Sequence, residues 1–217
     1  MGIGGPGSAA PPRFPRCLRL VEPAPPAAPL TDPAQIRAGY RRWQRRVLVS
    51  TILGYSGFYF VRKNLSIAMP LMERELGISK SSLGLFLTLH GILYGVSKFV
   101  NGFLGDRCNA RAFMVVGLAA SALMNVFFGL SSAVAVLGVV WMLNGCFQGM
   151  GFPPCGRLMT HWFSPQEFAT KFSIWNTSHS IGAGLIFVLC GSLLAPVSCR
   201  ACFLVPAAIA AACAAFL

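Results

Sequence analysis

Two adjacent cations, Arg62 and Lys63, lie near the middle of an otherwise uncharged and largely apolar run from Val47 to Met72. Roughly 20 residues of helix cross the hydrocarbon core of a bilayer, so this run is long enough to span one. A charge at that depth is costly unless it faces a bundle interior, a partner or a water-filled cavity. We therefore expect Arg62 and Lys63 to mark a functional site.

Three more ionisable side chains, His90, Lys98 and His179, lie inside later apolar runs, and none of these runs contains Asp or Glu. The missing counter-charge is then a bound anion, another part of the protein, or water in a cavity. Arginine holds a phosphate through two parallel hydrogen bonds, and lysine holds it as a point charge. These residue types are therefore typical of a phosphate or organophosphate site.

Aromatic side chains accompany the cations at helical spacing. Tyr55, Tyr59 and Arg62 are four and then three residues apart, so they share one stripe of the first span, which we expect to line a polar cavity. A second shared face carries His90, Tyr94 and Lys98. Ordinary helix packing, or a place in the aromatic belt at the membrane interface, is the alternative for the tyrosines.

Simpler interpretations stay open for the charged residues too. Extension of the side chain to the membrane surface is the alternative for Arg62 and Lys98. Lys63 points about 100° away from Arg62 on a helix, so surface extension or a supporting role is equally open for it. A neutral core histidine is the alternative for His179, which otherwise is a phosphate ligand or a proton-sensitive switch. For His90 we expect the core role.

Composition places these residues in a membrane protein. The chain has 217 residues, of which 55% are hydrophobic and 11% charged, and its mean hydropathy is +0.63. These values exclude a soluble enzyme. The formal net charge of +12 does not indicate nucleic-acid binding, because eight arginines precede the first apolar run, where they can set topology or contact anionic lipid.

The chain divides into three parts and predicts an all-α polytopic membrane protein. We expect a disordered cytoplasmic tail over 1–33, a basic amphipathic lead-in at the membrane surface over 34–46, and a bundle of six transmembrane helices over 47–217. The expected spans are 47–72, 83–104, 113–130, 134–154, 172–194 and a sixth from about 202, with Arg157, His161, Glu167 and Lys171 in the loop after the fourth. The distribution of Lys and Arg places the amino terminus in the cytoplasm.

Two small-residue patterns concern packing. Gly91 with Gly95, and Gly145 with Gly149, match the spacing that lets helices approach closely. Pro153 and Pro154 are expected to end or bend the fourth span. The eight cysteines are mostly buried hydrophobes by their positions, and we expect neither a metal nor a redox role for the lone Cys199/Cys202 pair, so no cofactor is predicted.

Several segments together resemble the organophosphate:phosphate antiporters of the major facilitator superfamily, the group of the glycerol-3-phosphate, hexose-6-phosphate and phosphoglycerate transporters. The resemblance runs from about Tyr40 to the end of the chain. The segments that carry it are Tyr59–Asn64, Tyr94–Phe99, Gly105–Arg111, Phe147–Arg157 and Trp175–His179.

The resemblance implies an inner-membrane antiporter that exchanges inorganic phosphate for a sugar, glycerol or glycerate phosphate by rocking two six-helix halves. It assigns the cavity cations to Arg62, Lys98 and His179, with Lys63 less securely. It places Tyr55, Tyr59, Tyr94 and Asn176 at neighbouring cavity positions. It makes the turn after the second span gating or structural, through Gly102, Gly105, Asp106, Arg107 and Arg111.

The sequence departs from this family in two ways. Cys199 stands where members usually have an aromatic residue before the arginine, here Arg200. The family's second half, with a further cavity arginine, is absent, so we expect this chain to be an amino-terminal half.

Two other functions can be weighed against the sequence, and one of them fits it. The first is a transporter-like membrane sensor of external hexose phosphate that acts with a histidine kinase, since it needs the same anion site. A proton-coupled exporter is disfavoured because the spans contain no carboxylate.

Overall fold

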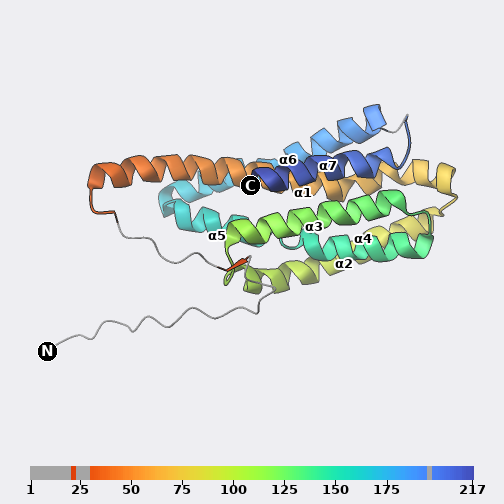
Figure 1. Cartoon of the computed structure of the whole chain (residues 1–217), viewed down its shortest axis with the longest axis horizontal. Coiled ribbons are helices and arrows are strands. Elements are labelled where there is room, and N and C mark those ends of the chain that lie inside the picture. Colours follow the sequence, from red (N-terminus) through yellow and green to blue (C-terminus); the bar gives the residue numbers. More distant parts are fainter. Residues whose placement is uncertain (1–20, 23–29, 195–196) are drawn as a thin grey trace.

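A computed structural model describes residues 21–22, 30–194 and 197–217. Most of the predicted 1–33 tail therefore lies outside the described residues. Within that tail Val21 is buried, and its carbonyl accepts the N–H of Asn109 at 2.6 Å. The described fold is an all-helical bundle, as predicted (Figure 1). Its helices are α1 (Pro33–Leu76), α2 (Lys80–Gly105), α3 (Ala110–Leu130), α4 (Val134–Gln148), α5 (Phe152–Trp162), α6 (Pro165–Val188) with a π-helical end η2 (Leu189–Leu194), and α7 (Ala201–Phe216).

Helix α1 is much longer than a membrane span. It begins at Pro33 after Asp32, whose carboxylate accepts the N–H of Ala34 at 2.9 Å. It ends at Leu76 and is capped by Gly77, whose φ of 65° suits glycine. Its 44 residues correspond to about 65 Å at 1.5 Å per residue. The predicted lead-in and the first span are thus one helix.

The position of the lead-in at the membrane surface stays a prediction, because the structure shows only that the lead-in and the first span form one helix. Figure 1 shows α1 (orange) extending past the other helices at its amino-terminal end. Its side chains hold it to the bundle there, because Tyr40 Oη and Gln44 Nε2 both donate to the carbonyl of Trp162, at 2.8 and 2.9 Å. No proline interrupts the helix between this attachment and the apolar run.

The fourth span is broken rather than continuous. Helix α4 ends at Gln148, and α5 begins at Phe152 with Pro153 in its first turn, where a missing N–H costs nothing. The predicted interruption near the proline pair is confirmed. The predicted loop after it was wrong, because Arg157 and His161 lie on α5, and Glu167 and Lys171 lie on α6.

Within the described residues, three segments are long and apolar enough to cross a membrane: Lys80–Gly105, Ala110–Leu130 and Val134–Trp162. Helix α7 is a shorter apolar helix. Large apolar side chains cover the outside of the bundle as well, such as Phe99 and Phe103 of α2, which are 86% and 62% exposed. Such an outer surface suits lipid, not water.

One of the two glycine pairs lies where two helices pack closely. Helix α1 packs against α6 and α7, while α4 packs against α2 and α3. A Cβ on Gly145 would lie 2.9 Å from the carbonyl oxygen of His90, and one on Gly149 would lie 2.8 Å from the nitrogen of Lys98, so this pair allows α2 and α4 to touch. No other described helix approaches Gly91 or Gly95, since a Cβ built on either has no atom of another helix within 4 Å, so a packing role for this pair stays a prediction.

Candidate anion-binding site

Arg62 of α1 stacks on an aromatic ring from another helix. Its Cζ lies 3.8 Å from the ring centroid of Tyr94 in α2 and 5.5 Å from that of Tyr59 in α1. The face of an aromatic ring attracts a cation through its quadrupole, and a guanidinium also stacks well. Arg62 is half-buried in this arrangement, so the bundle and not lipid surrounds it on one side.

Lys98 approaches the same ring from one helical turn further along α2. Its Nζ lies 5.9 Å from the centroid of Tyr94 and 3.8 Å from that of Phe152 at the start of α5. Tyr94 is therefore shared by two cations from two helices. Neither cation has a carboxylate within 4.0 Å in the described part of the chain, where the one ion pair joins Lys80 to Glu73.

His179 of α6 joins this group through Tyr59. The two ring centroids are 5.8 Å apart, and Tyr59 lies 5.5 Å from Tyr55. Close packing of α6 on α1 sets this spacing, because the Ser56 hydroxyl donates to the carbonyl of Ser178 at 2.9 Å and a Cβ on Gly182 would lie 2.7 Å from the carbonyl oxygen of Ser56.

The structure thus brings together most of the predicted site and leaves two residues aside. Helices α1, α2 and α6 supply one connected group, which we call the cation cluster: Arg62, Lys98, His179, Tyr55, Tyr59 and Tyr94. Lys63 and Asn176 are exposed and have no aromatic or hydrogen-bond contact to this group among the described residues. A substrate contact for these two stays a prediction.

Behind Arg62 lies a kink that the sequence analysis missed. Val61 departs from helical geometry, with φ −99° and ψ 15°. Its carbonyl accepts two side-chain amides from other helices, Nδ2 of Asn125 in α3 and Nδ2 of Asn144 in α4, each at 2.9 Å. Phe58, one turn earlier, has its carbonyl bonded to the Gln148 side chain at 3.2 Å.

Asn64 completes this amide network. Its Nδ2 donates to Asn125 Oδ1 at 2.7 Å and to the carbonyl of Cys202 at 3.0 Å, while its Oδ1 accepts the N–H of Leu65 at 3.1 Å. In a regular helix that N–H would bond the carbonyl of Val61. The network therefore satisfies the backbone groups that the kink disturbs. Asparagine and glutamine inside apolar runs are the sequence feature that could have predicted this network, because their side-chain amides are fully buried and need hydrogen-bond partners.

The predicted gating turn contacts α5. The carbonyls of Gly105 and Cys108 accept Nη1 of Arg157 at 2.8 and 2.9 Å. The sequence analysis did not predict this contact of Arg157 with the turn after α2, because it placed Arg157 in the loop after the fourth span. A groove of about 500 Å³ runs from Lys98 past Gly102 and Asp106 to Arg157, so it links the cation cluster to the turn.

The remaining turn residues are on the surface. Asp106 and Arg111 are exposed, and the Arg107 guanidinium lies 4.1 Å from the ring centroid of Phe103. No described residue of the bundle contacts Asp106 as an ion-pair partner. The gating role of these residues stays a prediction.

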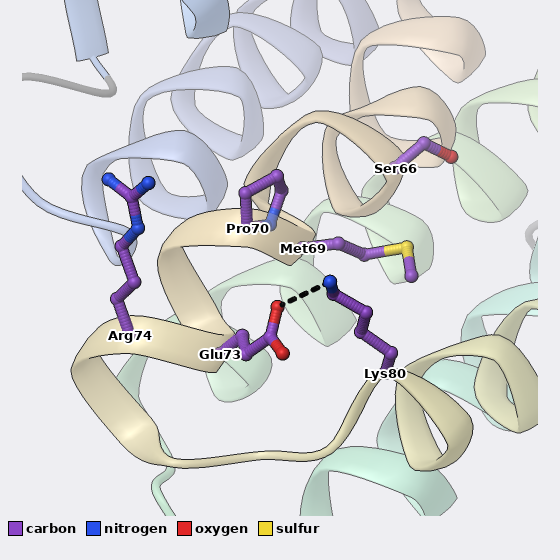
Figure 2. Close-up of a pocket in the computed structure, with 6 residues that line it drawn as sticks. All are labelled: Ser66, Met69, Pro70, Glu73, Arg74 and Lys80. Atoms are coloured by element: carbon purple, nitrogen blue, oxygen red, sulfur yellow. Dashed lines mark ion pairs between the residues drawn. The ribbon is translucent and has the colours of Figure 1, made fainter.

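A second pocket, of about 440 Å³, lies further along α1 (Figure 2). Ser66, Met69 and Glu73 line it, four, seven and eleven residues after Arg62 and so on the same stripe of the helix. Figure 2 shows Lys80 of α2 reaching across to Glu73, with 3.6 Å between Nζ and Oε2, while Arg74 points away from the pair. This pocket contains a carboxylate, whereas the cation cluster contains none.

Comparisons with known proteins agree with the helical bundle. Residues 51–217 match the family described as Major Facilitator Superfamily. The chain is 42% identical over 198 residues to the "Glycerol-3-phosphate transporter" of Bacillus subtilis, covering 89% of this chain and 44% of that protein. It is 43% identical over 177 residues to the "Probable hexose phosphate transport protein" of Chlamydia trachomatis, covering 82% of this chain and 39% of that protein.

A third relative carries the name of a sensor. The chain is 46% identical over 164 residues to the "Membrane sensor protein UhpC" of Escherichia coli, covering 75% of this chain and 37% of that protein. The chain thus spans about two fifths of the length of these relatives. The family match covers more than half of the chain, and none of the three relatives is named as an enzyme. The chain belongs to the Major Facilitator Superfamily.

Proposed function

We propose that this chain is the amino-terminal half of an antiporter that exchanges an organophosphate for inorganic phosphate across the inner membrane. Two of its named relatives are a glycerol-3-phosphate transporter and a probable hexose phosphate transport protein. A second six-helix half would supply the opposite wall of the cavity. The amino terminus would face the cytoplasm, on the side where basic residues accumulate.

One observation carries the proposal. Arg62 and Lys98, from two helices, lie within 6 Å of the ring of Tyr94 with no carboxylate in ion-pair range among the described residues. Two neighbouring cations at membrane depth favour an anion as their counter-charge. A phosphoryl group suits both, because it accepts a forked pair of bonds from arginine and a single charge-assisted bond from lysine.

The exchange mechanism follows from the charge of the empty site. Without an anion, Arg62 and Lys98 repel each other and any cation of the opposite half, so the empty cavity closes poorly. Bound phosphate neutralises that repulsion and lets the halves rock around it, which couples outward movement of one anion to inward movement of another. Tyr59 lies beside Arg62, and His179 lies beside Tyr59; both would contact the phosphoryl oxygens or the organic part of the substrate.

A membrane sensor is the second candidate. The relative named as a sensor is 46% identical to this chain, which is as similar as the transporters. A sensor would bind the same anion without moving it, and would pass the signal to a histidine kinase.

Exchange of labelled phosphate in proteoliposomes separates these functions. Proteoliposomes that contain the full-length protein carrying this sequence are loaded with labelled phosphate. They are then diluted into buffer that contains glycerol, hexose or glycerate phosphate. Release of label by one of these esters supports the antiporter and names its substrate. Binding of an ester without release favours the sensor, and absence of both contradicts an organophosphate site.

Three variants test the assigned roles in the same assay. Arg62→Ala and Lys98→Ala should both weaken the apparent affinity for phosphate, because each removes a positive charge from the site. Asp106→Asn should slow exchange with less effect on affinity, because it acts on the turn. Unchanged exchange and affinity in Arg62→Ala would refute the mechanism.

A further inference from the structure

A small basic pocket lies between α1 and α6 at the end of the bundle that carries the lead-in. Its volume is about 150 Å³, below the roughly 300–1,000 Å³ of pockets for drug-sized ligands. Arg41, Gln44 and Arg45 line it from one face of α1, at i, i+3 and i+4. Lys171 lines it from α6. We call it the lead-in pocket.

Its charges do not cancel. Glu167 is the one carboxylate that lines the pocket, against the three cations Arg41, Arg45 and Lys171. None of these cations lies within 4.0 Å of a carboxylate oxygen in residues 21–22, 30–194 and 197–217, so the carboxylate is not engaged by them. The pocket therefore has an excess of two positive charges and free donors for an anion.

Aromatic side chains beside the pocket mark the membrane surface. The ring of Trp162, at the end of α5, lies 5.6 Å from that of Tyr40 and 6.2 Å from that of Trp43, both in the lead-in. Tryptophan and tyrosine are enriched where the bilayer meets water. The pocket is then at the depth of lipid head groups and not in free solution.

Below the pocket an apolar strip begins. Leu48 and Phe163 are the apolar residues that line the pocket. Val49 and Leu53 lie one and two turns after Arg45 on the same stripe of α1, and both are exposed, at 51% and 43%. A ligand with a charged head and an apolar tail would bury its head among the cations and lay its tail along this strip.

We propose that the lead-in pocket binds the phosphate head group of an anionic phospholipid. Basic pockets between transmembrane helices on the cytoplasmic side are suited to such head groups, and each nearby Lys or Arg strengthens the attraction. The site is separate from the cation cluster, because Arg45 and Arg62 are 17 residues apart on α1, or about 25 Å at 1.5 Å per residue. Bound lipid would join α1 to α6 at this end of the bundle.

Native mass spectrometry of the full-length protein, titrated with dioleoyl-phosphatidylglycerol or dioleoyl-phosphatidylcholine, tests this site. The double variant Arg41→Gln/Arg45→Gln should weaken phosphatidylglycerol binding by about tenfold or more, since each basic residue contributes on the order of 1 kcal/mol. Arg41→Lys/Arg45→Lys should retain most of the binding. The matched control Arg42→Gln/Arg46→Gln removes the same charge from residues that do not line the pocket, and should change binding less than about twofold.

Three outcomes would overturn the proposal. Equal losses in the test and control variants would mean general surface attraction. Displacement of the lipid by millimolar inorganic phosphate would assign the pocket to a soluble anion. Binding by the 217-residue chain but not by the full-length protein would mean that another part of the protein occupies the pocket.

Discussion

Replacement of Asn125 by leucine should destabilise the bundle more than the same replacement of Asn144. Asn125 makes three hydrogen bonds, donating to the carbonyls of Val61 and Ser121 and accepting from Asn64. Asn144 makes one, to the carbonyl of Val61, and its Oδ1 is buried without a partner in the described part of the chain. Leucine has the same branching at Cγ and the same number of side-chain heavy atoms as asparagine, and its two methyl groups are larger than the amide oxygen and nitrogen, so neither change leaves a cavity and both add similar bulk.

The expected difference can be worked out from these bonds. Side-chain hydrogen bonds within membrane bundles average about 0.6 kcal/mol, so losing three costs about 2 kcal/mol. In Asn125→Leu, Val61 and Asn64 still have hydrogen-bond partners. The carbonyl of Val61 keeps the bond from Asn144, and the Asn64 side chain keeps its bond to the carbonyl of Cys202. For Asn144→Leu the one lost bond is offset by removal of an unpaired buried oxygen, which by itself costs about 1 kcal/mol or more. The net change is within about 1 kcal/mol of zero.

Reversible unfolding in mixed micelles, titrated with SDS and followed by circular dichroism, measures both changes. Equal destabilisation by the two variants would refute the reasoning, because it would mean that the bond count around Val61 does not set stability. Phosphate binding by the full-length Asn125→Leu protein adds a functional measure. Since the kink precedes Arg62 directly, loss of its bonds should lower phosphate affinity even where the folded fraction is matched.

Three further predictions concern other parts of the structure. Arg62→Lys should weaken apparent phosphate affinity in the exchange assay by roughly tenfold, since it loses both ring stacking and the forked pair of bonds; an unchanged affinity would contradict the site. Gly149→Ala should cost about 1–3 kcal/mol in the micelle assay, because its Cβ would meet the α2 backbone, whereas Gly95→Ala should not destabilise. Burial, followed by the nearby Glu75 carboxylate, raises the pKa of Cys199 in the loop before α7 to about 12. In a protein with Cys199 as its sole cysteine, the rate of alkylation should therefore rise about tenfold per pH unit from pH 7 to 10 without levelling. Glu75→Gln, which lowers the pKa of Cys199, should increase that rate. A plateau of the rate near pH 9 would contradict the raised pKa.

Local signals in the sequence predicted the face of α1 that carries Arg62 and its tyrosines, whereas the grouping with Lys98 and His179 came from the family resemblance. An apolar run with a charge in it requires a compensating environment, and the spacing of Tyr55, Tyr59 and Arg62 fixes a common helical face. The pairing of Arg62 with Tyr94 could not be read in this way. It depends on how α1 meets α2, which no local pattern encodes.

The amide network shows where sequence reasoning ended. Asn64 and Asn125 are 61 residues apart and bond directly. A buried amide predicts that a partner exists, but it does not identify the partner. The glycine pairs show the same limit, because a small residue permits contact on its face without specifying which helix, if any, lies there. Gly145 meets α2, while Gly95 meets nothing described.

The shared ring of Tyr94 has a consequence for proton coupling. Transporters that hold a cationic side chain with a carboxylate can exchange that partner for a proton, and substrate movement then depends on the pH difference across the membrane. An aromatic face attracts Arg62 and Lys98 without accepting or releasing a proton. Exchange driven by this site should accordingly follow the phosphate gradients more than the proton gradient.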